Sequence, residues 1–383
     1  MMKTLKNIIN KFPLGIRLFI REQLGLKNPI KLNLLKVNLR NEFSIFEEQN
    51  VGLKIKDGSE TWYKSFKKFI KAQPEESEVA FEFFKDSISV LKLSNLEKEN
   101  VKVILVCVVK NDLLKIKNLV KHHRRIGVKH FAILDNGSSD GTVEWLKDQN
   151  DVDLFLVQDK YTTNRREAWV NKIIAYYGFK RWYLILDSDE LFAFHKMESK
   201  NIEYLINYCE KHSIDRMRAV MIDMYGSDSF YSENQEGDYL EKCKYFDLNS
   251  YKHENRDIID LITGGPRSRI FNQRPWLTKY PLCYFVEGDI QGKSHYLFPY
   301  KKNKNTKCYS AILHYKFLPS DFKKYRNIAT EGNYFNGSIQ YKDYINHLDN
   351  SNGLSFMDER SVEYSDSDSL YMIPILDKIN FDE

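Results

Sequence analysis

The chain has 383 residues, of which 42% are apolar and 14% aromatic, so it can bury a large core and is not a disordered protein. Its net charge of +5 is too small for a dedicated nucleic-acid binder. No apolar run approaches the ~20 residues of a membrane span. The five cysteines are odd in number and lack metal-ligand spacing, and the start of the chain lacks a secretory signal. We therefore expect reduced thiols in a cytoplasmic protein.

The positive charge is concentrated near the N-terminus. Residues 1–72 contain 15 Lys and Arg against 6 Asp and Glu, which gives this segment a charge of +9. Apolar and basic residues are interspersed over residues 1–36, as in a helix that lies on an anionic membrane surface. The alternative is a basic surface helix packed on its own domain. We expect residues 1–100 to form a basic appendage without catalytic residues.

From residue 101 the chain alternates apolar strands with helices. Gly127 and Gly178 each follow a helical pattern and are expected to end it, as C′ glycines do. This alternation predicts an α/β fold with a mostly parallel sheet flanked by helices. The predicted strands are 103–109, 130–134, 152–157 and 182–187, and the predicted helices are 113–126, 143–146 and 164–177.

After residue 192 the pattern becomes less regular. We predict a strand at 218–224, a polar excursion at 226–260, a cation-rich turn at 264–269 and a strand within 307–317. The remaining residues form a helical tail. The expected organisation is an N-terminal appendage at 1–100, a main domain at 101–318 and a C-terminal tail at 319–383.

The strand at 182–187 runs directly into the acidic segment Asp187-Ser188-Asp189-Glu190. Ligands of open α/β sheets bind outside the carboxyl ends of the strands. If the strand geometry persists, Asp187 and Asp189 point the same way, and two such carboxylates need a cation between them. A hard divalent ion, Mg²⁺ or Mn²⁺, could then join them to a diphosphate. The alternative is a strand end followed by a solvated acidic turn.

Polar segments also follow two earlier strands. These segments are Lys110-Asn111-Asp112 and Asp135-Asn136-Gly137-Ser138-Ser139-Asp140-Gly141-Thr142. In a parallel sheet they gather at the same edge as Asp187, where carboxylates and amides can bind a base or a ribose. The chain has neither a G-x-G-x-x-G pattern nor a Walker-type lysine loop, which disfavours a dinucleotide fold and a P-loop.

Residues 103–192 resemble the nucleotide-sugar-binding half of GT-A glycosyltransferases of the family-2 type. The segment 135–142 is similar to the family's D-x-G-S-x-D-G-T loop, and Asp187-Ser188-Asp189 is similar to its metal-binding D-x-D motif. The resemblance is fainter at 264–279 and 313–317. It implies a Rossmann-like GT-A fold and an inverting, Mn²⁺- or Mg²⁺-dependent hexosyl transfer. The donor would be a nucleotide-diphosphate sugar, UDP favoured, and the acceptor a glycan or lipid-linked molecule in surface polysaccharide or glycoconjugate synthesis.

The resemblance also implies roles for single residues. Asp135 would contact the base, Asp140 would orient the base or ribose, and Asp187 and Asp189 would flank the ribose and chelate the metal. The triplet at 110–112 stands where relatives often carry Arg-Asn-Glu and would close the nucleoside pocket. The expected nucleotide-binding residues of these segments are Lys110, Asn111, Asp112, Asp135, Asn136, Ser138, Asp140, Asp187 and Ser188.

A late histidine serves as a further metal ligand in many GT-A enzymes, which draws attention to His314. It lies inside an apolar run, so its imidazole needs a partner. The expected metal ligands are therefore Asp187, Asp189 and His314. The alternative is a hydrogen-bonded core histidine, and His295 is a second candidate ligand.

The remaining candidates serve the leaving group and the acceptor. The cations expected near the diphosphate are Arg166, Arg267, Arg269 and Lys279, with structural ion pairs as the alternative. The expected catalytic carboxylates are Asp189, Glu287 and Asp289, with Asp223 and Glu190 as further candidates. Five aromatic side chains could either stack on sugars or fill the core: Trp276, Tyr280, Tyr284, Phe285 and Tyr296.

Two other functions stay open. A sugar nucleotidyltransferase would carry a glycine-rich phosphate loop with a signature lysine near the chain start, and this sequence has none. A non-catalytic nucleotide-sugar- or glycan-binding module could keep the same fold. Donor hydrolysis in the presence of Mn²⁺ distinguishes an enzyme from a binder.

Overall fold

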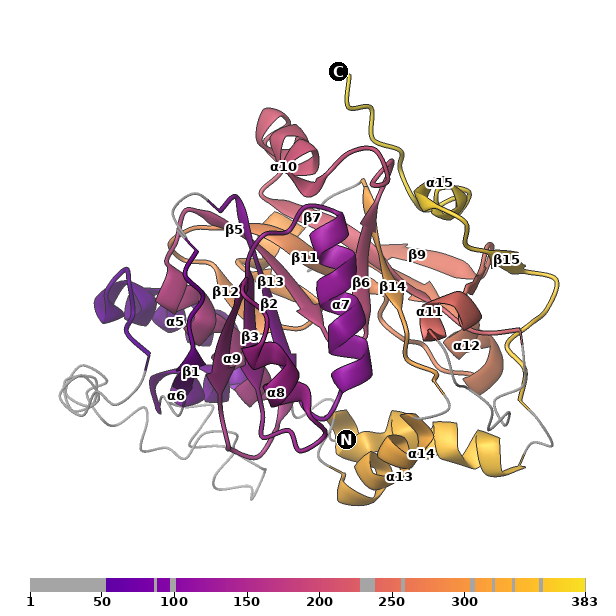
Figure 1. Ribbon diagram of the computed structural model, residues 1–383, viewed down its shortest axis with the longest axis horizontal. Coiled ribbons are helices and arrows are strands. Elements are labelled where there is room, and N and C mark those ends of the chain that lie inside the picture. The colour runs from indigo at the N-terminus through magenta and orange to yellow at the C-terminus, as the bar shows by residue number, and fades with distance from the viewer. Residues whose placement is uncertain are drawn as a thin grey trace, which may run out of the picture.

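The computed structural model describes residues 53–85, 88–96, 101–227, 238–255, 259–303, 307–318, 321–332, 335–350 and 354–382. Helices surround a central sheet in which nine strands are described (Figure 1). The basic segment 1–52, with its predicted membrane-surface helix, lies outside the described residues. Within those ranges, none of the helices has the length and apolar character that crossing a bilayer requires.

The central sheet is mixed, and most of its strands run in one direction. Its order is β1-β4-β3-β2-β5-β11-β7-β14-β6. Strands β2, β3, β4 and β5 are parallel to one another, β7 and β14 run the same way, and β1, β11 and β6 run opposite. The α/β prediction is thus confirmed. The bounds are β1 Ser89–Lys92, β2 Val103–Val109, β3 Phe131–Asp135, β4 Val152–Leu156, β5 Arg181–Asp187, β6 Glu190–Phe194, β7 Arg216–Asp223, β11 Thr278–Phe285 and β14 Ser310–His314.

The half of the sheet built from β2 to β5 follows the sequence prediction closely. Its helices connect consecutive parallel strands, because parallel strands need a crossover connection. Gly127 and Gly178 have positive φ angles of 98° and 94° and end two of these helices, as predicted. The helices are α7 Leu113–Arg125, α8 Thr142–Lys147 and α9 Thr163–Tyr177.

The other half of the sheet differs from the prediction. Strand β11 lies between β5 and β7, although no strand was expected at 278–285. The cation-rich segment 264–269 is the end of a strand followed by a helix that starts with Gly265-Pro266, because proline suits the first helical turn. The other elements of this region are α10 Ile202–Lys211, α11 Tyr239–Lys242, α12 Gly265–Phe271, β8 Tyr245–Asp247, β9 Tyr251–Asn255, β10 Asp260–Gly264, β12 Ile290–Lys293, β13 Tyr296–Phe298 and the 3-10 turn η3 Tyr300–Asn303.

Two apolar clusters cover the two faces of the sheet. Alternation along β2 sends Leu105 and Cys107 into one cluster and Ile104 and Val106 into the other. The first cluster includes residues of α7 and α10, and the second includes residues of α9. The N-terminal helices α5 (Ser59–Ala72) and α6 (Ser77–Lys85) add aromatic side chains to the second cluster. Residues 89–92 form the edge strand β1, which pairs with β4.

The C-terminal region begins with two helices, α13 (Asp321–Glu331) and α14 (Phe335–Asn350), which lie together below the sheet in Figure 1. A third, aromatic cluster joins these helices to Tyr225 and Phe271. Beyond α14 the predicted helical tail is mostly irregular. It contains a short strand, β15 (Ser361–Glu363), which pairs with β8, and a short helix, α15 (Ser367–Leu370).

Candidate functional site

A cleft of about 1340 Å³ opens at the edge of the sheet where β2 and β5 end. The segments that follow β2 and β5 line one part of it. The start of β11, the turn between β12 and β13, and residues of α13 and α14 line the rest. This is the edge at which open α/β sheets bind ligands. Most of the charged residues singled out in the sequence meet here.

The acidic segment forms the turn between β5 and β6. Strand β5 ends at Asp187, and β6 begins at Glu190. Strand geometry does not persist through Ser188, so the two aspartates do not face one partner together. Asp187 contacts the cations of neighbouring elements, whereas Asp189 faces a histidine.

Two cations of the protein neutralise Asp187. Arg166 Nη2 lies 2.7 Å from Asp187 Oδ1, and Lys279 Nζ lies 2.9 Å from Asp187 Oδ2. Desolvation in the cleft opposes ionisation of the carboxyl, but Arg166 and Lys279 outweigh it and lower the pKa of Asp187 below its usual range. Lys279 Nζ also lies 2.5 Å from Glu190 Oε1. The cation therefore bridges both ends of the β5–β6 turn.

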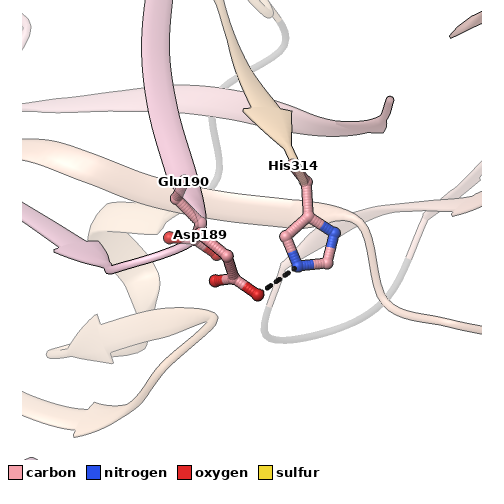
Figure 2. A group of neighbouring side chains, drawn as sticks. All are labelled: Asp189, Glu190 and His314. Carbon is pink, nitrogen blue, oxygen red and sulfur yellow. Dashed lines mark ion pairs between the residues drawn. The ribbon is translucent and has the colours of Figure 1, made fainter. Parts of the chain in front are cut away.

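Asp189 faces His314, as Figure 2 shows. The distance from Asp189 Oδ2 to His314 Nε2 is 3.6 Å. On its other side, His314 Nδ1 lies 2.6 Å from Asp223 Oδ1 and donates a hydrogen bond to it, since a carboxylate can only accept. Burial disfavours the imidazolium, but Asp189 and Asp223 together raise the pKa of His314. Asp223 thus holds Nδ1 of His314, and Nε2 points toward Asp189.

Strand pairing explains the position of His314. Strand β14 lies between β7 and β6, and its last residue, His314, is opposite Asp223 on β7 and Glu190 on β6. Asp223 is buried and also accepts a hydrogen bond from Arg267 Nε at 2.8 Å. Three strands that are distant in the sequence therefore place His314, Asp223 and Glu190 at one edge, and α12 adds Arg267.

The donor atoms of this edge suit a divalent cation. Asp189, Glu190 and His314 each offer one ligand atom, and these atoms lie within 4.8 Å of one another. Glu190 is already bound to Lys279 and also accepts the Asp187 N–H at 3.1 Å. A carboxylate and an imidazole whose other nitrogen is held by a carboxylate form a donor set that fits Mn²⁺ and, less well, Mg²⁺. Asp187, expected as a ligand, does not belong to this group.

The polar segments after β2 and β3 lie together. Asn111 N–H donates to Ser138 Oγ at 2.8 Å, and Asn111 Oδ1 accepts from Ser139 N–H at 2.7 Å. Ser188 Oγ donates to Asp112, which joins the first segment to the β5–β6 turn. The cleft is lined by Lys110, Asn111, Asp112, Asn136, Ser188 and Asp187. The polar segments therefore lie together at one edge of the sheet, as the sequence predicts.

Three loop residues expected at the nucleotide are not among the cleft-lining side chains. Asp135 is buried and accepts from Ser138 N–H at 2.8 Å, while its Oδ2 has no hydrogen-bond partner in the described part of the chain. Asp140 accepts from Leu113 N–H at 3.0 Å and from Thr142. Together with Ser138, these residues shape the loop and fix the starts of α7 and α8.

Of four other predicted residues, one lines the cleft and three do not. Arg267 lines the cleft, whereas Arg269 pairs with the buried Asp247 outside it. Asp289 is buried and pairs with Arg216 at 2.8 Å. The structure does not bring Asp289 or Glu287, the two expected acceptor-side carboxylates, to the cleft.

His295 lines the cleft but is not part of the acidic group. Its Nδ1 lies 3.0 Å from the Thr278 carbonyl and donates to it, which leaves Nε2 as an acceptor. Burial and the nearby Lys279 lower the pKa of His295 to about 3, so the ring is neutral near pH 7.

Several cleft residues were not predicted from the sequence. The buried Lys115 on α7 pairs with Asp321 on α13, with 2.7 Å between Nζ and Oδ2. Glu167, beside Arg166 on α9, and Tyr325 and Tyr341 on the C-terminal helices also line the cleft. A lysine within an amphipathic helix gives no sequence signal of its partner in another element, and helices α13 and α14 carry no motif.

Comparison with known proteins gives little further information. No family model matches the chain, and no curated protein matches it. Among solved structures, the crystal structure of HddC from Yersinia pseudotuberculosis is similar with 11% identity and a TM-score of 0.30, over 58% of this chain and 96% of that one. A likeness at this level says nothing about activity.

Proposed function

We propose that the chain is a metal-dependent glycosyltransferase of the GT-A type. It would move a sugar from a nucleotide-diphosphate sugar, UDP being the favoured carrier, to a glycan or lipid-linked acceptor. The observation that carries the proposal is the contact of Asp189 with His314, backed by Asp223, in a cleft at the carboxyl edge of the sheet. The similarity of residues 135–142 and 187–189 to family motifs supports the same assignment.

A Mn²⁺ or Mg²⁺ ion would be held by Asp189 and His314, and it would supply positive charge for the departing diphosphate. Asp223 acts on His314 rather than on the ion. Its hydrogen bond keeps the proton on Nδ1 and leaves the Nε2 lone pair for coordination. The buried Arg267 in turn holds Asp223 ionised.

The chain's own residues would bind the nucleotide. Arg166 and Lys279 hold Asp187 as a carboxylate of fixed orientation, whose position next to Ser188 and Asp112 suits hydroxyl groups of a ribose. Lys110 and Lys160 are exposed, line the same side of the cleft, and make no ion pair with any residue of the described ranges. Their charges are available to the phosphates.

A nucleotide-sugar panel tests the proposal. Thermal stability is measured with UDP-, GDP- and dTDP-sugars, each with and without Mn²⁺, and donor hydrolysis is followed in parallel. A ligand at 100 times its Kd raises the free energy of unfolding by about 2.7 kcal/mol. We expect stabilisation and hydrolysis that need Mn²⁺ and are lost in Asp189→Asn.

The matched control is Glu203→Gln, a charge removal on the surface of α10, which should leave both readouts unchanged. Mn²⁺-dependent binding without hydrolysis or transfer would support a binding module instead. Binding of no nucleotide-sugar would refute the proposal.

A further inference from the structure

An exposed tryptophan, Trp276, lines the cleft just before the start of β11. Trp62, Trp169 and Trp182 are at most 3% exposed, and Trp145 is partly buried, whereas Trp276 is 38% exposed. Trp276 lines the cleft and follows Pro275, whose ring restricts the backbone there. A large apolar surface kept open inside a cleft indicates a ligand that covers it.

Two aromatic rings extend this surface. The Tyr296 ring lies 6.2 Å from the Trp276 ring at an interplanar angle of 37°, and the His295 ring lies 6.2 Å away at 72°. His295 and Tyr296 belong to the turn and strand at the tip of the β12–β13 hairpin. We call Trp276, His295 and Tyr296 the aromatic platform. It presents ring faces together with Ser294 and His295, whose polar atoms can bind hydroxyl groups.

The topology places the platform away from the nucleotide side. Strand β11 is antiparallel to β5, and its register brings its first residues to the edge where β5 ends. Trp276 precedes this start, and in the strand order β11 lies on the opposite side of β5 from β2 and β3. Lys110, Asp112 and Asn136 follow β2 and β3. The Asp187–Glu190 turn thus separates the nucleotide side of the cleft from the aromatic platform.

The charges next to the platform are paired, whereas Lys110 and Lys160 on the nucleotide side make no ion pair within the described ranges. Arg274 forms an ion pair with Glu254, and Lys293 forms one with Glu76. A neutral ligand with an apolar face and a hydroxylated rim matches such a surface. Sugar rings have this chemistry, because their axial C–H groups form a face that packs on an aromatic ring.

We infer that the aromatic platform is the acceptor subsite and that the acceptor presents a neutral sugar ring, stacked on Trp276. This inference rests on the proposed function and narrows its acceptor from a glycan or lipid-linked molecule to a neutral saccharide terminus. Trp276 binds the acceptor and takes no part in donor or metal binding.

Saturation-transfer NMR with neutral disaccharides tests the inference, because it needs neither donor nor turnover. The probes are cellobiose, lactose and N,N′-diacetylchitobiose, and a uronic-acid disaccharide is the charged comparison. At least one neutral probe should bind wild type and Trp276→Phe, and bind Trp276→Ala roughly 3- to 10-fold more weakly. The control Tyr204→Ala removes an exposed aromatic ring of α10 outside the cleft and should bind as wild type.

The outcomes separate this inference from the proposed function. Trp276→Ala should keep the Mn²⁺-dependent stabilisation by nucleotide-sugar. Loss of that stabilisation would place the platform at the nucleobase and overturn the inference. Equal disaccharide binding by Trp276→Ala, preference for the uronic acid, or no binding by any neutral probe would also overturn it. Disaccharide binding at Trp276 without any nucleotide-sugar binding would refute the glycosyltransferase and leave a glycan-binding site.

Discussion

His314 Nε2 lies 3.6 Å from Asp189 Oδ2, between the end of β14 and the β5–β6 turn. Because Nδ1 is committed to Asp223, Nε2 is the nitrogen that can exchange a proton for a metal ion. If no metal binds, the contact between His314 and Asp189 is an ion pair. A metal ligand and an ion-pair partner give different changes in ion binding and in stability when His314 is substituted.

Substitution of His314 by alanine should remove one ligand and weaken Mn²⁺ binding more than Mg²⁺ binding, because imidazole suits Mn²⁺ better. A 100-fold loss in affinity would reduce the stabilisation by Mn²⁺, at 100 times the original Kd, from about 2.7 to about 0.4 kcal/mol. Thermal shift with each ion measures this. A less stable protein with unchanged ion preference would identify His314 as a structural core residue.

Substitution Asp223→Asn should weaken Mn²⁺ binding roughly 10- to 100-fold without removing a ligand, because it disturbs the tautomer of His314. Loss of a buried charge also leaves Arg267 unpaired, so some stability is lost as well. Asp247→Asn is the matched control, since Asp247 is equally buried and pairs with Arg269 away from the cleft. Calorimetric Mn²⁺ affinities that fall equally in both variants would exclude a positioning role.

Lys279 should be essential for the stability of the β5–β6 turn. Lys279→Met leaves Glu190 buried beside Asp187 with its cation removed, and breaking a buried ion pair from one side typically costs about 3–5 kcal/mol. The double variant Lys279→Met/Glu190→Gln should recover part of this loss. Urea unfolding measures both, and a single variant as stable as wild type would contradict the assigned bridge.

Lys115 should couple α7 to α13 across the cleft. Its ammonium is buried, and although burial opposes protonation, Asp321 raises the pKa of Lys115 above its usual value. Lys115→Met should therefore destabilise the protein and weaken nucleotide-sugar binding, whereas Lys121→Met on the exposed face of α7 should do neither. Thermal unfolding with and without donor checks both effects.

The first half of the fold could be predicted from the sequence because its strands are mostly apolar runs that alternate with amphipathic helices. Strand β11 could not, because Lys279 and Pro281 both argue against a central strand. The structure accommodates them locally. The β11–β7 register shifts between Lys279 and Leu282, around the proline, and Asp187 and Glu190 neutralise the lysine.

The site could be predicted only in part, because the sequence marks its motif residues but not their partners. Motif residues such as Asp187 and Asp189 carry their own sequence signal, and His314 stood out as a polar residue in an apolar run. The partnerships of His314 with Asp223 and of Lys115 with Asp321 depend on strand order and helix docking. Glu287 and Asp289 were expected only because transfer needs a carboxylate on the acceptor side, and neither residue lines the cleft.

Two adjacent histidines of α7 hold β6 through its residue Phe192. His122 Nε2 donates to the Phe192 carbonyl at 2.7 Å. His123 donates from Nδ1 to the Leu119 carbonyl at 2.7 Å and accepts the Phe192 N–H at Nε2, 3.2 Å away. His123 therefore has to be neutral, because an imidazolium has no acceptor. Burial lowers the pKa of His122 to about 4 and that of His123 well below its ordinary value.

These contacts predict acid destabilisation between pH 6.5 and pH 4. In this range unfolded histidines bind protons that the folded His122 and His123 exclude, so the free energy of unfolding rises with pH. The contribution of the two neutral histidines to stability is fully present above about pH 6.5. The raised pKa of His314 acts in the opposite sense, because its contribution is present at low pH and is lost as the pH rises. His122→Gln should remove up to about 1.4 kcal/mol per pH unit from the slope in urea unfolding. An unaltered slope in His122→Gln would contradict the exclusion of the proton from the folded His122.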